Sequence, residues 1–216
     1  DPATGTMVRE GVESIINPLD LYAIETGIQI KEKIGGKITV ISMGPSMAEE
    51  ALREAIAMGC DEGILLSNKN FAGSDTWATS YTISQAIKKL GKYDLILCGE
   101  RATDGDTGQV GPAISAWLDN PVSTYISKII ELRENSMIIE RLIENGYETL
   151  EIGTPCLLTV VKEIAYPSLP TLRGKLRAKK IEIPIWGPDD IDADPKSLGL
   201  KGSPTRVVKI TTPKIA

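Results

Sequence analysis

Residues 93–118 read YDLILCGERATDGDTGQVGPAISAWL and contain the pattern that decides the fold. Residues 93–98 are a short apolar run that predicts a buried strand, and residues 109–118 predict a helix. Between them, residues 99–108 are rich in glycine and small polar side chains. A buried strand that leads through such a loop into a helix is typical of a parallel sheet covered by helices.

The chain before this stretch repeats the alternation of strand and helix. Residues 37–43 and 62–66 predict strands, and residues 75–90 predict a helix. Alternation of this kind indicates βαβ units with right-handed crossovers. We therefore expect a Rossmann-like α/β domain over residues 1–185, with helices on both faces of a mostly parallel sheet.

Two further helix starts are marked by capping patterns. Asn17 and Pro18 fit an N-cap followed by proline at the first helical position, and Asp20 adds an acid to the first turn. Ser46 and Glu49 have the spacing of a capping box, in which the two side chains bond each other's backbone amides. Each pattern predicts a helix.

The character of the chain changes after Pro121. Four strand-like runs follow without helices between them, at residues 122–130, 137–141, 147–152 and 156–161. They predict an antiparallel or mixed extension of the sheet. From Trp186 the chain is rich in proline, aspartate and glycine, so we expect residues 186–216 to be an extended tail that wraps a partner and adds nothing to the core.

Composition excludes several functions. The net charge of −5 gives no reason to expect a nucleic-acid partner, and no window approaches the roughly 18 apolar residues of a membrane span. Histidine is absent, which removes the commonest general base and every Ser-His or Cys-His nucleophile. The three cysteines, Cys60, Cys98 and Cys156, are far apart, and we expect reduced, buried thiols of a cytosol-like compartment.

Ligands of open parallel sheets gather where strands end and helices begin. Residues 17–20, 43–46 and 99–109 are three such places, and the third is the most informative. Its backbone amides and the dipole of the following helix suit the binding of a phosphate. The alternative interpretation is a strand-to-helix turn whose Asp and Gly have only structural roles. Asp104 and Asp106 repel phosphate, so we expect them to bond backbone amides or ribose hydroxyls. No glycine fingerprint of a dinucleotide fold, no P-loop and no metal-ligand cluster is visible.

The segment from Ala165 to Pro170 places Tyr166 directly before Pro167 and Leu169 between Pro167 and Pro170. Proline-stiffened apolar tips lose little entropy on docking, so an exposed Leu169 would anchor a partner, unless the loop folds back on its own domain. The basic stretch at residues 173–180 is interpreted as a solvated face.

Taken in order, these segments resemble the β subunits of electron-transfer flavoproteins along nearly the whole chain. The resemblance rests on GV at 11–12 with IINP at 15–18, VISMGP at 40–45, AMGCD at 57–61, DLILCG at 94–99, DGDTGQV at 104–110, YPSLP at 166–170 and GLKGSPT at 199–205. No single piece suffices, but the ordered set is specific.

The resemblance implies a heterodimer with a larger α subunit that carries an electron-transferring FAD. The β subunit of simple members binds AMP, whereas in electron-bifurcating members a second FAD occupies that site and is reduced by NADH. Partner dehydrogenases of the lactate or acyl-CoA type, and ferredoxin as a low-potential acceptor, are compatible with it. Motif matching implies nucleotide contacts from Asn17, Pro18, Leu19, Asp20, Met43, Gly99, Glu100, Arg101, Ala102, Thr103, Asp104, Gly105, Asp106 and Thr107. It implies dehydrogenase docking through Tyr166, Pro167, Leu169 and Pro170.

The chain departs from the family pattern in three respects. Family members begin with a buried strand that Asp1 already follows, and they continue past residue 216, so we expect both ends to be incomplete. The docking segment lacks the usual Asn and Arg before Tyr166 and carries an additional Gly174-Lys175.

Two features resemble the family members that hold a second FAD and therefore favour FAD over AMP. They are Asp20, in place of a bulkier apolar residue, and Gly105 in the short loop. Arg101 is a candidate to stabilise an anionic flavin or a phosphate, with surface solvation as the alternative. A nucleotide-binding sensor of the stress-protein type is an alternative function from another class. An NAD dehydrogenase that acts without partner subunits is a weaker alternative. We expect a cytoplasmic location, or the mitochondrial matrix in a eukaryote.

Overall fold

The computed structural model describes residues 14–208. Its helices are α1 (Asp20–Ile34), α2 (Glu49–Met58), α3 (Thr76–Leu90), α4 (Val110–Leu118), α5 (Leu172–Ala178) and α6 (Gly199–Gly202). Its strands are β1 (Thr39–Met43), β2 (Glu62–Leu66), β3 (Leu95–Gly99), β4 (Val122–Leu132), β5 (Ser136–Ile143), β6 (Gly146–Gly153), β7 (Cys156–Val160) and β8 (Ile185–Trp186). The GV motif at residues 11–12 lies outside the described residues.

The strands form two sheets, and the expected α/β class is confirmed. One sheet has the order β1-β2-β8 and is parallel throughout. The other has the order β3-β7-β4-β5-β6, in which β7 is parallel to both of its neighbours and β5 and β6 form the antiparallel extension. Among the described strands, β1 and β3 are not hydrogen-bonded to each other.

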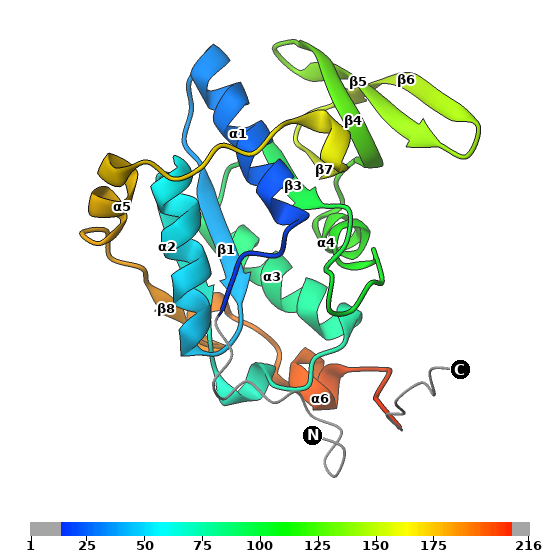
Figure 1. Cartoon of the computed structure of the whole chain (residues 1–216). Coiled ribbons are helices and arrows are strands. Elements are labelled where there is room, and N and C mark those ends of the chain that lie inside the picture. The colour runs from blue at the N-terminus through cyan, green and yellow to red at the C-terminus, as the bar shows by residue number, and fades with distance from the viewer. Residues whose placement is uncertain (1–13, 209–216) are drawn as a thin grey trace, which may run out of the picture.

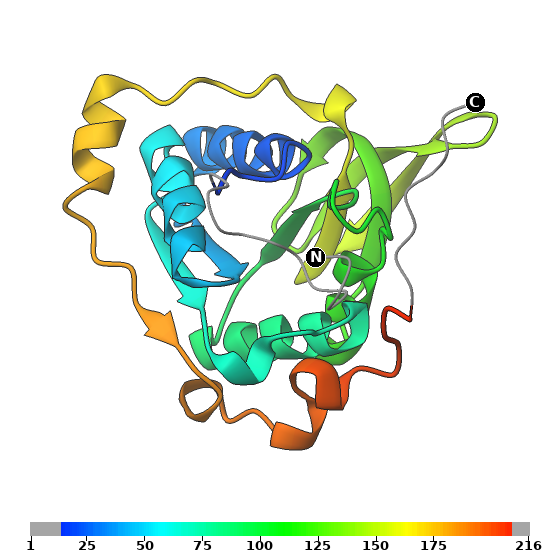
Figure 2. The ribbon, with the colours of Figure 1, turned by 60° about the horizontal axis from the view of Figure 1, so that its bottom comes forward.

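Helices cover both faces of the strands, as expected. In Figures 1 and 2, α1 and α2 lie on one side and α3 and α4 on the other. The alternation of side chains along β1 explains the two cores: Val40 packs with Leu52 and Ile56 of α2, whereas Ile41 packs with residues of α3 and β2. No helix within residues 14–208 is long and apolar enough to span a bilayer.

Both predicted caps are wrong. The helix α1 begins at Asp20, with Leu19 in the N-cap position and no side-chain cap, because the Asn17 side chain is bonded to the loop after β3 instead. The capping box is also absent, since a 3-10 turn precedes α2 and no side chain caps that helix. The Glu49 carboxylate pairs with Arg53 one turn later, at 2.5 Å, and does not reach back to Ser46.

The expectation that the tail holds no core residues is wrong for its described part. Ile191, Ala193 and Leu198 are buried in one cluster with Tyr81 of α3 and Leu66 of β2. Two 3-10 turns, at Asp189–Ile191 and Pro195–Ser197, let these spaced apolar side chains reach the sheet and α3 although the segment has little regular structure. Figure 2 shows the tail running along the outside of α3.

The three thiols are unpaired, as expected. Burial raises the pKa of Cys60 and Cys98 to about 12 and that of Cys156 to about 11. All three therefore remain protonated near neutral pH and are poor nucleophiles.

Candidate functional site

The Asn17 side chain holds the loop after β3 to the start of α1. Its amide nitrogen donates to the Arg101 carbonyl at 3.0 Å and to the Asp20 carboxylate at 3.1 Å, and its amide oxygen accepts the Thr103 backbone N–H at 3.2 Å. These bonds join residues 84 and 86 positions apart in the chain. The structure thus brings two of the three predicted places together.

The Asp20 carboxylate reaches across to the end of β3. It accepts the Gly99 backbone N–H at 2.7 Å, and it is enclosed between that amide and Asn17. Burial raises the pKa of the Asp20 carboxyl above its usual value, although the bonds from Gly99 and Asn17 oppose the shift.

Gly99 is required by the close approach of α1 to β3. A Cβ at this position would stand 2.7 Å from the Leu19 carbonyl carbon and 2.8 Å from the Asp20 carboxylate oxygen. Both distances are below van der Waals contact, so a larger residue would push α1 away from the loop. Gly99 is predicted to be a nucleotide contact, and packing of α1 within the chain already explains why this position is a glycine.

The charged residues of the loop largely satisfy one another. Asp104 accepts the Gly105 backbone N–H at 2.7 Å, which confirms the expectation that it bonds an amide. Asp106 does not do so, because its carboxylate lies 3.0 Å from the Arg101 guanidinium, which also approaches Glu100 at 3.6 Å. The two ion pairs with Arg101 reduce the local negative charge, and each of the three carboxylates of the loop faces a protein partner.

Several loop amides remain available for an anion. Within the described residues, no acceptor is found for the backbone N–H groups of Asp104, Thr107 and Gly108, and residues 101–107 are exposed. The helix α4 starts directly after them, so its own first amides and its dipole add to the donor set. The donors suit a phosphate or diphosphate, and the paired carboxylates do not prevent it.

Not every predicted contact residue belongs to this arrangement. Pro18 is exposed beside Asn17, and Ala102 contributes its carbonyl, which accepts the Asp106 N–H at 2.8 Å. Met43 ends β1, but its side chain packs toward the core cluster that contains Leu66 and Tyr81. No bond in the described structure joins Met43 to residues 99–107.

The predicted docking segment is exposed at its apolar tips. Tyr166 is 91% exposed and Leu169 89% exposed, while the Ser168 backbone N–H between them donates to Glu25 at 3.0 Å. Glu25 is buried on α1, where Gln29 also donates to it at 2.9 Å. Sequence analysis missed this anchor, because a glutamate on an amphipathic helix gives no sign of a partner 143 residues away.

The basic stretch at residues 173–180 contains one arginine that bonds to the body of the domain, and its other basic residues are exposed. Arg177 is bonded to the carbonyls of Ile56 and Cys60 at the end of α2, so it holds α5 in place. Gly174 is needed there because a Cβ would meet the Ala57 carbonyl oxygen at 2.0 Å. The other basic residues of the stretch are exposed, in agreement with a solvated face.

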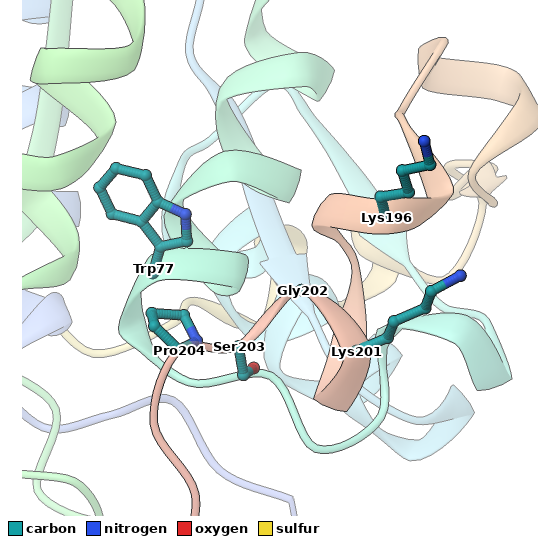
Figure 3. A pocket seen from close by; sticks show the side chains of 6 residues that line it. All are labelled: Trp77, Lys196, Lys201, Gly202, Ser203 and Pro204. Atoms are coloured by element: carbon teal, nitrogen blue, oxygen red, sulfur yellow. The ribbon is translucent and has the colours of Figure 1, made fainter.

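A separate cavity of about 480 Å³ lies between the start of α3 and the tail. Figure 3 shows that its two lysines, Lys196 and Lys201, point away from Trp77 on the opposite side. The polar groups do not converge on one point, so this cavity resembles a surface depression more than a ligand site. Sequence analysis did not identify it.

Fold and loop together define an α/β protein with an exposed, amide-rich loop at the carboxyl end of a parallel strand. The comparisons with known proteins place it more narrowly. The model of the electron transfer flavoprotein domain matches residues 4–191. The chain belongs to the electron transfer flavoprotein family.

The chain is similar to a named β subunit, to a subunit of a reductase-Etf complex and to a FixA protein. The chain is 53% identical to the electron transfer flavoprotein subunit beta of Thermoanaerobacterium thermosaccharolyticum, over 99% of this chain and 82% of that one. It is 47% identical to subunit CarD of the caffeyl-CoA reductase-Etf complex of Acetobacterium woodii, over 99% and 81%. It is 42% identical to the protein FixA of Azotobacter vinelandii, over 99% and 78%. These matches favour the electron-transfer class over the sensor and the free-standing dehydrogenase.

Proposed function

We propose that this chain is the β subunit of a heterodimeric electron transfer flavoprotein and that its loop at residues 99–108 binds the diphosphate of FAD. The observation that carries the proposal is the set of bonds by which Asn17 and Asp20 hold the loop open toward solvent with amides free. Such a preformed set of donors needs little reorganisation to accept an anion.

Each residue of the site has a definite part in binding. Asn17 fixes the loop, Asp20 holds the start of α1 against Gly99, and the amides of Asp104, Thr107 and Gly108 donate to phosphate oxygens. When bound, the flavin would accept hydride from NADH and release electrons singly, to the α-subunit flavin and to a low-potential acceptor such as ferredoxin. The protein supplies binding, orientation and the local charge.

The partners in this proposal are an α subunit, which the tail contacts, and a flavin dehydrogenase of the lactate or acyl-CoA type. The exposed Tyr166 and Leu169, flanked by Pro167 and Pro170, are the proposed docking residues. The names of the relatives support an assembly of this kind, since CarD is a subunit of a reductase complex. A cytoplasmic location is part of the proposal.

Extraction of the bound nucleotide tests the proposal. The chain is co-expressed with its α subunit, purified as a complex, denatured, and the released nucleotides are separated and quantified. Two FAD per heterodimer and little AMP are expected. Recovery of one FAD and one AMP would instead establish a simple carrier whose β site holds AMP. Recovery of no second nucleotide would show that residues 99–108 do not bind one.

A matched pair of variants ties the nucleotide to the loop. Asn17→Ala removes three bonds to the loop and α1, and we expect at least a tenfold loss of nucleotide affinity. Asn68→Ala is the control, because Asn68 also accepts a backbone amide but lies in a separate turn. Equal affinity of the two variants would show that the nucleotide binds elsewhere.

A further inference from the structure

Tyr125 has a backbone conformation that is unusual for an aromatic residue. Its φ is +59°, in the left-handed region where bulky side chains are rare and where a residue costs about 1–3 kcal/mol. Such conformations persist only when the surrounding structure imposes them. The fold must therefore hold Tyr125 in place by other contacts.

A β-bulge in β4 imposes this conformation. Ser123 is opposite Leu158 and Ile126 is opposite Val160, so three steps along β4 match two along β7. Ile126 is fully buried, and the Tyr125 N–H leaves the strand ladder to donate to the Thr159 hydroxyl at 3.2 Å. A bulge of this kind re-aims one side chain and is frequent beside active sites.

The bulge has a second local cost. The Ser123 hydroxyl is buried and has no hydrogen-bond partner within the described residues. A buried hydroxyl without a partner costs about 1–3 kcal/mol. Two unfavourable features within three residues indicate that the direction of the Tyr125 side chain has a function, because stability alone would favour a regular strand.

The bulge directs Tyr125 toward the nucleotide loop. Its hydroxyl lies 3.9 Å from the place where a Cβ on Gly108 would stand, and Gly108 itself has a φ of +63°. Tyr125 is 45% exposed as a residue, so a ligand can reach it from solvent. Figure 1 shows β4 running next to α4, the helix that the loop precedes.

Tyr125 also borders an open cavity of about 470 Å³. The remaining lining residues are Arg141, Leu142, Ile143 and Glu144, at the end of β5. The Arg141 guanidinium is paired with Glu148 at 2.6 Å, so the lining is mostly aliphatic and aromatic. A flat, weakly polar ring would suit this wall better than a charged group.

We propose that Tyr125 is a cofactor-contacting residue, whose ring packs against the distal flat ring of a dinucleotide held at residues 99–108. This inference rests on the proposed function and deepens it, because it names the residue that distinguishes FAD from AMP. AMP has no distal ring, so it would bind the loop amides without needing Tyr125. The ring contact would add to the affinity for FAD alone.

The test uses the full complex with its α subunit, stripped of nucleotide and titrated with FAD and, separately, with AMP. Tyr125→Asn removes the ring, and asparagine tolerates the left-handed backbone. We expect its FAD affinity to fall about tenfold, as befits an aromatic ring contact, while its AMP affinity stays within twofold of wild type. Tyr125→Phe keeps the ring and should retain FAD affinity within about twofold.

The control is Tyr166→Asn, the same substitution at an exposed tyrosine away from the loop, which should leave both affinities unchanged. Tyr125→Gly is a second variant in case the first folds poorly, since glycine adopts this backbone region freely. The visible spectrum of the β-site flavin should also change in both ring-deleted variants but not in Tyr125→Phe.

Three outcomes separate the possibilities. Unchanged FAD affinity and spectrum in Tyr125→Asn and Tyr125→Gly would overturn the inference and leave the proposed function intact. Equal losses for FAD and AMP would also overturn it, since they would show a structural role for Tyr125. A wild-type complex that takes AMP but no second FAD would end the proposed function, and with it this inference.

Discussion

At the scale of single residues, short-range contacts decide the shape of the candidate site. Gly99 allows α1 to approach β3, and Asn17 then ties the loop to that helix. Neither residue needs to touch a ligand to matter for the site, because each fixes the position of the amides that we propose to bind the nucleotide. The site glycine and asparagine are therefore explained first by packing and only then by binding.

Gly99→Ala is expected to destabilise the protein by about 1–3 kcal/mol, since the added methyl group would overlap the Leu19 carbonyl and the Asp20 carboxylate. Urea unfolding measures the loss. Gly105→Ala is the matched control in the same loop, where a Cβ would find its nearest neighbour, a Thr107 methyl group, at 4.0 Å. A Gly99→Ala variant as stable as Gly105→Ala would contradict this account.

At the scale of elements, Asp75 connects the start of α3 to the tail. One carboxylate oxygen caps α3 by accepting the N–H groups of Trp77 and Ala78, each at 3.0 Å. The other accepts the N–H and the hydroxyl of Thr205, at 2.9 and 2.7 Å. Burial alone would raise the pKa of Asp75, but these hydrogen bonds outweigh it and hold the pKa below its usual value.

The sign of the resulting pH dependence follows directly. A lowered pKa means that the unfolded chain binds the proton more readily, so Asp75 stabilises the fold above its unfolded pKa of about 3.9 and loses this effect as the pH falls through the lower, folded value. Asp75→Asn keeps the cap but cannot accept both bonds from Thr205. We expect it to cost about 0.5–1.5 kcal/mol at pH 7 and progressively less as the pH falls below the unfolded value of about 3.9.

Urea midpoints of wild type and Asp75→Asn across this pH range provide the measurement. Asp119→Asn serves as the control, because Asp119 is exposed in the left-handed region, which asparagine tolerates, and its carboxylate makes no hydrogen bond within residues 14–208, where only its backbone N–H is bonded, to the Ser115 carbonyl. A stability difference that persists undiminished in acid would show that the carboxylate charge is not the cause.

At the scale of the whole molecule, two leucines outside the central elements have opposite environments. Leu198 of the tail is 2% exposed and packs with Phe71 and Tyr81, whereas Leu169 of the proposed docking segment is 89% exposed. The tail therefore contributes to the core of this chain, and the docking segment does not. Their substitutions should separate folding from partner binding.

Leu198→Ala is expected to lower the free energy of unfolding by about 2–5 kcal/mol, because it leaves a cavity under the tail. Leu169→Ala should change it by less than about 0.5 kcal/mol and should instead weaken binding to a partner dehydrogenase by tenfold or more. Thermal unfolding and a binding titration of the complex measure the two effects. Full dehydrogenase affinity in Leu169→Ala would remove the leucine from the docking surface.

Local patterns predicted most elements well because they depend on neighbours in the chain. The strand at Glu62–Leu66 has the predicted bounds, and the predicted helix at residues 75–90 needs only its cap residue, Asp75, excluded. The predictions at Asn17 and Ser46 failed for one reason. A capping residue is recognised from local spacing, but its side chain bonds whichever group the fold brings nearest, and for Asn17 that group is the loop after β3.

The amino-acid order alone therefore determined the α/β class, the loop at residues 99–108 and the family, since periodicity, glycine placement and ordered motifs are all written along the chain. Only the tertiary structure decided that Glu25 anchors Ser168, that the tail is part of the core, and that a bulge turns Tyr125 toward Gly108. Each of these depends on contacts between residues far apart in sequence, whose partners no local pattern specifies.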